Sequence, residues 1–308
     1  MAKLVAVTGA TGFVGPHLVS ALARHGWKTR LLIRRWSPLP PLGGVEAEIV
    51  WGGLADEGSL RRLVDGADAV IHAAGLIKAR TPSDFWTVNR DGTARLAGLA
   101  PDLPFVLLSS LAAREPQLSP YAASKRAAEE AVGRRRTSWL AVRAPAVYGP
   151  GDRETLAYFR TAAHGLALRP NLADARLSLI HVADLAEALA LVVDRSPPAG
   201  VYEIDDGREG GYSYADMAAA AGTALGRRAR LVPIARSVMM GIAWLNRLRH
   251  SLGGSAQILT PAKVNEIYHR DWTLSDRRLA SALGFVAGHD LAGGFRDTVL
   301  WYRRQGWL

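Results

Sequence analysis

The sequence predicts an α/β protein: a doubly wound parallel sheet with helices on both faces, and a small carboxy-terminal α/β lobe. Two observations support this fold class. Short apolar, β-branched runs alternate with segments whose apolar residues recur at helical spacing. A glycine-rich turn joins the first such run to the first helical segment. With 308 residues, the chain can bury a large core and an additional lobe.

The chain opens with a strand over residues 4–7 and a helix over residues 13–23, joined by a turn that contains three glycines. Gly9 can take the unusual dihedrals of the turn, Gly12 has no Cβ to block a pyrophosphate, and Gly15 lets the helix approach the strand. Backbone amides at the start of the helix would then face the phosphates. We therefore predict a dinucleotide site of the Rossmann type at this turn.

The second strand, over residues 29–33, ends in Arg34-Arg35 instead of an acidic residue. In a dinucleotide fold the tip of this strand faces the adenosine ribose, where a carboxylate accepts from the 2′-hydroxyl and an arginine binds a 2′-phosphate. The site is therefore predicted to favour NADP(H) over NAD(H), with Arg34 nearest the strand end. The alternative is that both arginines are ordinary surface charges.

The next elements are a strand over residues 45–51, a helix capped by Asp56, and a strand over residues 69–72. The fourth strand ends at His72, which we interpret as a core histidine. The small residues that follow it, Ala73-Ala74-Gly75, would let the backbone touch the adenine half of the cofactor. A helix over residues 83–99 contains Asn89, and an amide in mid-helix suggests a tertiary partner.

The fifth strand, over residues 105–108, ends in Ser109-Ser110, and a helix opens soon afterwards with Tyr121-Ala122-Ala123-Ser124-Lys125. Because Tyr121 and Lys125 are four residues apart, they share one helical face. An ammonium group lowers the pKa of a nearby phenol from about 10, so that the phenol can exchange a proton with a substrate oxygen. Such a pair is often a mere surface contact, but its place after two serines favours catalysis.

Together these segments resemble the short-chain dehydrogenase/reductase superfamily of the extended or atypical type, which includes the NAD-dependent epimerase/dehydratase family. The motifs cover roughly the first two thirds of the chain and are far more specific together than a glycine triplet alone. They are Thr8-Gly9-Ala10-Thr11-Gly12-Phe13-Val14-Gly15, His72-Ala73-Ala74-Gly75, Asn89, Ser109-Ser110, Tyr121 to Lys125, and Arg143-Ala144-Pro145-Ala146-Val147-Tyr148-Gly149-Pro150-Gly151.

The resemblance implies that Tyr121 is the general acid or base and that Lys125 holds the nicotinamide ribose and tunes the tyrosine. A serine hydrogen-bonds the reacting oxygen in such enzymes; Ser110 matches it by its offset from the strand, and Ser109 is the alternative. Asn89 resembles the asparagine that supports a proton relay. The residues expected to contact the cofactor are Gly9, Thr11, Gly12, Phe13, Val14, Gly15, Arg34, Arg35, Leu54, Ala73, Ala74, Gly75, Ser109, Tyr121, Lys125, Pro145 and Val147.

Two features depart from the family pattern. Many extended members have Gly-Asp-Leu where this chain has Gly52-Gly53-Leu54, so the carboxylate that meets the adenine amino group is missing and Leu54 must serve with neighbouring backbone groups. The connection from Ser110 to Tyr121 is also short compared with nucleotide-sugar epimerases. This second departure speaks against a sugar-nucleotide substrate.

We expect residues 1–150 to form the dinucleotide-binding domain and residues 151–308 to form a substrate lobe, some of whose segments return to the Rossmann core. In the lobe, Asp184 is interpreted as the N-cap of a helix. The segment from Val238 to His250 has an apolar body and a basic end, which suits a lid, a helix lying in a membrane interface, or a core helix. The carboxy-terminal end of the chain resembles that of hydroxysteroid dehydrogenase-like and flavonol reductase-like members of the superfamily.

The composition bears on which metals, partners and cellular location we expect. The chain has no cysteine, which excludes disulfides and thiolate chemistry, and its histidines show no metal-binding spacing, so we expect no metal. Its charge of +10 is spread without a nucleic-acid motif, so we expect no nucleic acid but an anionic membrane surface or a phosphorylated cofactor. No apolar run could span a bilayer and the first residues leave no room for a signal sequence, so we expect a cytoplasmic protein; peripheral association with a membrane is the alternative.

The sequence therefore predicts an NADP(H)-dependent oxidoreductase that interconverts a ketone and a secondary alcohol on a bulky apolar substrate: a steroid, a polyphenol or a lipid ketone such as a ceramide-type intermediate. One alternative is a nucleotide-sugar epimerase or dehydratase that retains its cofactor. The other is a non-catalytic, cofactor-binding subunit of a membrane complex. The Tyr121 and Lys125 pair argues against the latter. The sequence leaves the oligomeric state open.

Overall fold

The computed structural model describes residues 3–251 and 259–308, and contacts between backbone positions divide the chain into two compact units. The first unit comprises Met1–Ala144, Leu185–Ile204 and Asp276–Phe285. The second comprises Pro145–Asp184, Asp205–Ser275 and Val286–Leu308. The chain thus first changes unit after Ala144, whereas the sequence suggested residue 150, and two later segments belong to the first unit.

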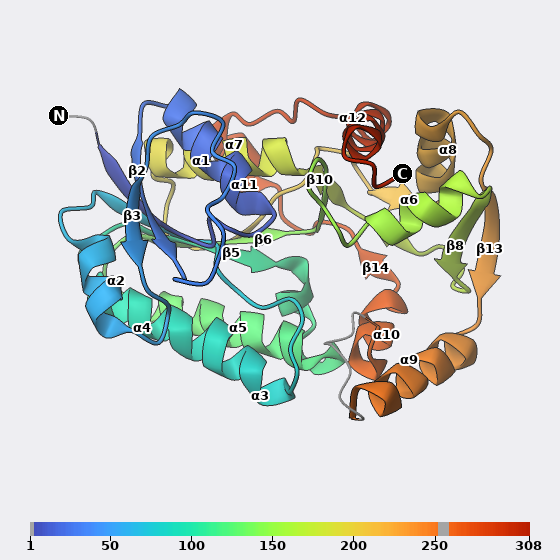
Figure 1. Ribbon diagram of the computed structural model, residues 1–308, viewed down its shortest axis with the longest axis horizontal. Coiled ribbons are helices and arrows are strands. Elements are labelled where there is room, and N and C mark those ends of the chain that lie inside the picture. Colours follow the sequence, from blue (N-terminus) through green and yellow to red (C-terminus); the bar gives the residue numbers. More distant parts are fainter. Residues whose placement is uncertain (1–2, 252–258) are drawn as a thin grey trace. The chain divides into compact units, whose positions relative to one another are not determined.

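Within the described residues, the first unit holds a seven-stranded sheet in the order β11-β6-β5-β4-β1-β2-β3, and all neighbouring strands are parallel (Figure 1). This order, in which the chain winds outward from β1 in both directions, confirms the doubly wound fold. The strands are β1 (Leu4–Thr8), β2 (Lys28–Ile33), β3 (Glu48–Trp51), β4 (Ala69–His72), β5 (Phe105–Ser110), β6 (Trp139–Ala144) and β11 (Gly200–Glu203).

Helices cover both faces of this sheet (Figure 1). One face carries α1 (Val14–Arg24), most of α7 (Val182–Arg195) and α11 (Arg278–Leu283), and the other carries α2 (Glu57–Val64), α4 (Gly92–Leu99) and α5 (Pro120–Gly133). The helix predicted over residues 83–99 is continuous but changes type, through α3 (Pro82–Phe85), the π-helical η1 (Trp86–Asp91) and α4; the short 3₁₀ segments η2 (Leu111–Arg114) and η3 (Pro116–Leu118) precede α5.

The core of the first unit explains the apolar runs of the sequence. Ala6, Val70 and Leu107 of the central strands are fully buried and pack with Leu63 of α2 and Leu96 of α4. A parallel sheet covered on both faces buries both sides of each strand, which is why these strands read as continuous apolar segments.

The second unit is built from small sheets and five helices in the part of the chain that is described. Its strand pairs are β7 (Ala146–Tyr148) with β10 (Leu179–His181), β8 (Leu166–Pro170) with β13 (Arg230–Ile234), and the order β12-β9-β14 (Tyr212–Ser213, Arg176–Leu177, Asp271–Trp272). Its helices are α6 (Leu156–Ala163), α8 (Tyr214–Leu225), α9 (Arg236–Ser251), α10 (Pro261–Ile267) and α12 (Leu291–Arg304).

An aromatic cluster forms the core of the second unit. Phe159 and Phe295 meet edge to face with ring centroids 4.9 Å apart, and Tyr148 and Tyr302 pack against them. These four side chains are almost fully buried, so α6 and α12 are held together by apolar burial. None of the helices described in this chain has the length and apolar character needed to cross a bilayer.

Candidate active site

The glycine turn lies between β1 and α1, as predicted. Gly9 has a φ of +84°, and a Cβ there would lie 2.6 Å from the carbonyl carbon of Ala73. A Cβ on Gly15 would lie 2.4 Å from the carbonyl oxygen of Ala10. Packing within the protein therefore requires glycine at both positions.

Gly12 is different, because the contact that a Cβ there would make is a milder one, 3.2 Å from the carbonyl oxygen of Gly9. The turn itself is closed by a hydrogen bond of 3.0 Å from the Gly12 amide to that same oxygen. A side chain at Gly12 would therefore clash less with the rest of the protein than one at Gly9 or Gly15. This fits the expectation that Gly12 leaves room for a pyrophosphate, and the residues of the turn fit a dinucleotide.

The two arginines expected at the adenosine end, Arg34 and Arg35, follow β2 directly and are exposed. At the tip of the neighbouring strand β3, a Cβ on Gly53 would meet no atom within 4 Å. The next residue, Leu54, is held by a hydrogen bond of 2.7 Å from Arg95 Nη1 to its carbonyl oxygen. Exposed guanidinium groups thus lie at the strand tip where a 2′-phosphate is expected, and the preference for NADP(H) stays a prediction.

His72 is a core histidine, as predicted. It is fully buried at the end of β4, and its two ring nitrogens lie 2.7 Å from Thr8 Oγ1 and 2.9 Å from Thr93 Oγ1. Burial, with a smaller contribution from the charge of Lys125, lowers the pKa of His72 to about 3. The imidazole is therefore neutral at physiological pH and positions the Ala73–Gly75 segment that follows.

Asn89 lies in the π-helical turn η1 and has the tertiary partners that its mid-helix position suggested. Its Oδ1 accepts from the Leu76 amide at 2.7 Å, and its Nδ2 donates to the Leu76 carbonyl at 3.0 Å and to Ser124 Oγ at 3.0 Å. Ser124 Oγ in turn donates to the Tyr121 carbonyl at 2.7 Å. Asn89 therefore links the segment after β4 to the first turn of α5; its role in a proton relay stays a prediction.

The Tyr121 and Lys125 pair occupies the first two turns of α5, which is capped by Ser119. Lys125 is only 6% exposed, and its Nζ donates to the Leu108 carbonyl at 2.7 Å. The same Nζ lies 3.8 Å from the point that a Cβ on Gly75 would occupy. Tyr121 is partly exposed and meets the Phe85 ring edge to face, with centroids 5.9 Å apart.

Burial lowers the pKa of Lys125 to about 8, and the negative charge of Glu129 opposes this shift. The ammonium group is thus kept charged at neutral pH by a carboxylate one helical turn away. A lysine at the surface would need no such support. Lys125 is therefore a buried cation beside the segment that follows β4.

The two serines at the end of β5 have different partners. Ser109 is buried, and its Oγ donates to Glu129 Oε1 at 2.6 Å. Ser110 is partly exposed, and its Oγ accepts from the Ala112 amide at 3.2 Å, which leaves its own proton available. Ser110 is therefore the serine whose hydroxyl proton is not committed to Glu129. Its contact with a substrate oxygen stays a prediction, as does the contact of Ser109 with the cofactor.

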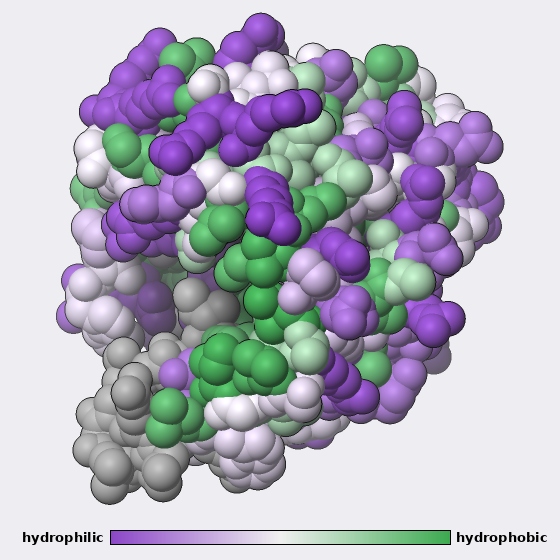
Figure 2. Space-filling model, turned by 90° about the vertical axis from the view of Figure 1, so that its right-hand side faces the viewer, coloured by the Kyte–Doolittle hydropathy of each residue, from purple (hydrophilic) through white to green (hydrophobic). Residues whose placement is uncertain are grey.

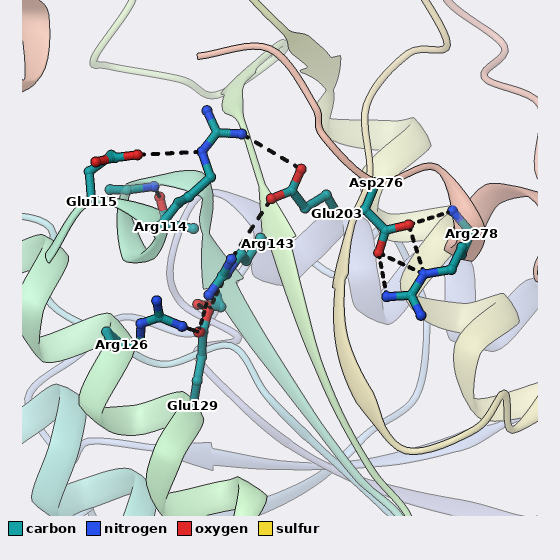
Figure 3. Close-up of polar contacts among 11 residues, drawn as sticks. Arg114, Glu115, Arg126, Glu129, Arg143, Glu203, Asp276 and Arg278 are labelled. Carbon is teal, nitrogen blue, oxygen red and sulfur yellow. Dashed lines mark hydrogen bonds and ion pairs between the residues drawn. The ribbon is translucent and has the colours of Figure 1, made fainter. Parts of the chain in front are cut away.

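A buried ionic network behind these serines was not predicted from the sequence (Figure 3). Glu129 accepts two hydrogen bonds from Arg143, from Nε at 2.9 Å and from Nη2 at 2.7 Å. Arg143 Nη1 also lies 3.8 Å from Glu203 of β11, and Arg114 lies 3.9 Å from the same carboxylate. The one available signal was that Glu129 follows Lys125 by four residues and so shares its helical face.

The prediction that Asp184 is a helix N-cap is wrong. The helix α7 already begins at Val182, and Asp184 accepts hydrogen bonds of 3.0 Å from the amides of Gly288 and His289. His181, Asp184 and His289 bring potential metal-ligand atoms within 4.8 Å of one another, although the sequence showed no metal-binding spacing. Both carboxylate oxygens of Asp184 already accept hydrogen bonds from backbone amides. We therefore interpret this cluster as an anchor that holds residues 288–289 against α7.

Pro145 and Val147 were expected to contact the cofactor, and both belong to the second unit. Val147 lies in β7, where it pairs with Ile180 of β10. Their contact with the cofactor stays a prediction. So do the cofactor contacts of Thr11, Phe13 and Val14 in the turn and at the start of α1.

Comparison with known proteins places this geometry among nicotinamide-dependent enzymes. Residues 5–205 match the model of the NAD dependent epimerase/dehydratase family. The chain is 43% identical over 307 residues to a ceramide reductase of Caulobacter vibrioides, covering 99% of this chain and 96% of the relative. It superposes on the crystal structure of gox2253 with a TM-score of 0.81 at 21% identity, over 100% of both chains. It also matches MoeE5 in complex with UDP-glucuronic acid and NAD, with a TM-score of 0.72 at 25% identity over 98% of this chain and 99% of that one.

Proposed function

Because the chain belongs to the NAD dependent epimerase/dehydratase family, we propose that it is an NADP(H)-dependent reductase that converts a ketone on a bulky apolar lipid to a secondary alcohol. The chain is an NAD(P)-dependent enzyme of the extended short-chain dehydrogenase/reductase kind. The proposal adds three finer points: the phosphorylated cofactor, the direction of a net reduction, and a substrate of the ceramide type.

The observation that carries the proposal is the burial of Lys125 beside Gly75 and Asn89, one helical turn from Tyr121. An ammonium group in this position binds hydroxyls and favours the ionised form of a neighbouring phenol. Nucleotide binding alone could use the ammonium group, but it would have no need of a phenol one helical turn away as well. The pair therefore supports a proton-transfer function.

The residues of the first unit have separate roles in the proposed reaction. A bound nicotinamide supplies the hydride that the carbonyl carbon receives. Tyr121 donates the proton to the carbonyl oxygen, and Ser110 donates a hydrogen bond to the same oxygen. Lys125 holds the ribose hydroxyls, and Asn89 keeps the first turn of α5 in register with the segment after β4. In the reverse oxidation, Tyr121 accepts the proton.

The cofactor and substrate proposals have different support. The exposed Arg34 and Arg35 at the tip of β2 favour a 2′-phosphate, hence NADP(H). The resemblance to a ceramide reductase along nearly the whole chain favours a long-chain keto lipid with a neighbouring amide. Steroid and polyphenol ketones are the next classes to compare.

Net consumption of NADPH is the test. We expect stoichiometric oxidation of NADPH with a ceramide-type ketone, formation of the secondary alcohol, and little turnover with UDP-sugars. The similarity to MoeE5 makes nucleotide-sugar chemistry the alternative. Conversion of a UDP-sugar with retained cofactor and no net NADPH oxidation would favour that alternative. No turnover with any carbonyl, together with stable association with a membrane complex, would favour a non-catalytic subunit.

A further inference from the structure

The helix α9 in the second unit has an unusual distribution of apolar side chains. Its Ala243 is fully buried, so this position faces the rest of the unit. On the opposite side of the helix lie Val238, Ile242 and Leu245, which follow one another at intervals of four and three residues and are 55%, 47% and 50% exposed. Trp244 is 54% exposed on the flank. A helix of a soluble protein normally presents polar residues at such positions.

The exposed apolar surface continues onto the strand pair that precedes α9. Leu166 and Leu168 of β8 are both exposed and, being two residues apart, lie on one face of the strand. The parallel register places Val232 of β13 beside Leu168 and Arg230 beside Leu166. Figure 2 shows hydrophobic residues gathered on this face of the second unit, with hydrophilic residues around them. We refer to Leu166, Leu168, Val232, Val238, Ile242, Trp244 and Leu245 as the apolar face.

The charge of the surrounding chain has one sign. From residue 217 to residue 265 there are six arginines and one lysine, and neither aspartate nor glutamate. Arg228 precedes β13, Arg230 begins it and Arg236 begins α9, and all three are exposed. A large part of the protein's net charge of +10 therefore lies in the segment that carries most of the apolar face.

We propose that the apolar face and its arginines dock the protein on an anionic lipid bilayer, with α9 lying in the interface. Exposed apolar side chains enter the boundary between headgroups and acyl chains, and the arginines bind lipid phosphates. A second copy of the chain is a poorer occupant, because the segment from residue 217 to residue 265 carries only cations and two copies of it would repel each other. A nucleic acid would neutralise the arginines but would leave the apolar side chains in water.

Vesicle flotation of the full chain, without substrate or cofactor, tests this docking. Wild-type protein is expected to float with vesicles of phosphatidylcholine and phosphatidylglycerol, to float poorly with phosphatidylcholine alone, and to be released at high salt. The double variant I242E/L245E is expected to lose roughly tenfold or more of its partition coefficient. The double variant R228Q/R230Q is expected to bind the anionic vesicles more weakly and with a smaller dependence on salt.

Matched controls carry the same changes elsewhere. Leu39 and Val286 are 61% and 87% exposed, so L39E/V286E adds the same charge at other exposed apolar positions and should float like wild type. R61Q/R62Q removes two positive charges from α2, as R228Q/R230Q does from the second unit, and should also float like wild type. Circular dichroism and thermal unfolding of each variant confirm that it is folded.

Three results would overturn the proposal: no flotation of the wild type, equal flotation with neutral and anionic vesicles, or unchanged flotation of folded I242E/L245E. Light scattering identifies the other occupant, because a wild-type dimer that I242E/L245E converts to monomers would assign the apolar face to a second copy. Vesicle binding is measured without turnover, so its failure leaves the proposed reductase activity standing, and the converse also holds.

Discussion

The carboxylate of Glu129 binds the guanidinium of Arg143 through two hydrogen bonds of 2.9 and 2.7 Å, and both side chains are buried. The same carboxylate accepts the hydroxyl proton of Ser109 and supports the charge of Lys125. Glu129 therefore connects strands β5 and β6 to the helix that carries Tyr121 and Lys125. We predict that it is a positioning residue that acts through Lys125 and Ser109.

Replacing Glu129 with Gln should lower the free energy of unfolding by about 3–5 kcal/mol, because Arg143 is then left as a buried charge without its main partner. It should also lower the pKa of Lys125 below its value of about 8, since Glu129 is the group that raises it. Urea denaturation measures the first effect, and the pH dependence of cofactor binding the second. Arg126, whose side chain is 41% exposed and 4.0 Å from Glu129, is the control: R126A should cost at most about 1 kcal/mol. Equal effects of E129Q and R126A would contradict this role.

Gly9 and Gly26 offer a matched comparison, since their φ angles are +84° and +79°. A Cβ on Gly26 meets nothing within 4 Å, whereas on Gly9 it meets the Ala73 backbone at 2.6 Å. G26A should therefore cost only about 1–2 kcal/mol of backbone strain. G9A adds a steric overlap between β1 and the segment after β4, and should unfold more easily and lose cofactor affinity. Similar unfolding midpoints for the two variants would show that the close approach at Gly9 is not rigid.

Much of this architecture was predictable from local patterns. The strands at 4–8 and 69–72 were indicated by apolar runs. The bounds of α8 are also set by local signals, because Ser213 and Asp216 form a capping box and Gly226 ends the helix in the left-handed region. The pair Tyr121 and Lys125 was predictable because helical spacing alone fixes their common face.

Other features depended on contacts between distant segments. Asp184 accepts hydrogen bonds from amides more than a hundred residues later in the chain, so the local capping rule wrongly predicted that it is an N-cap. The pairing of Arg143 with Glu129 and Glu203 depends on the strand order β11-β6-β5, which no local pattern contains. The sequence showed that α9 is apolar, but only the burial of Ala243 shows which side of the helix faces outward.

His72 should make the stability of the protein depend on pH under mildly acidic conditions. Its pKa is about 3 in the folded protein, against the ordinary 6.5 of an exposed histidine, so the unfolded chain binds more protons between these values. Stability is therefore lost as the pH falls through 6.5 toward 3, at up to about 1.4 kcal/mol per pH unit from this group. In H72N that slope should shrink, while H164N, at an exposed position, should keep it. Denaturant unfolding over this pH range measures both, and an unchanged slope in H72N would refute the assignment.

Arg34 and Arg35 should set the preference between the two nicotinamide cofactors. In R34S/R35S the affinity for NADPH should fall roughly 10- to 100-fold, the range expected for lost hydrogen bonds between charged groups, while the affinity for NADH stays within a few fold. Fluorescence titration of both cofactors gives the ratio, and R61S/R62S on α2 controls for the change in net charge. An equal loss of affinity for NADPH and NADH would show that the arginines do not bind the 2′-phosphate.

The most direct test of the central claim is to replace Tyr121 with Phe and measure turnover and cofactor affinity in the same preparation. The variant removes the proton donor and keeps the ring that meets Phe85. We predict that reduction of a ceramide-type ketone falls at least roughly 10²- to 10⁴-fold, whereas the dissociation constant for NADPH changes by only a few fold. Turnover close to that of wild type in the folded variant would contradict the account.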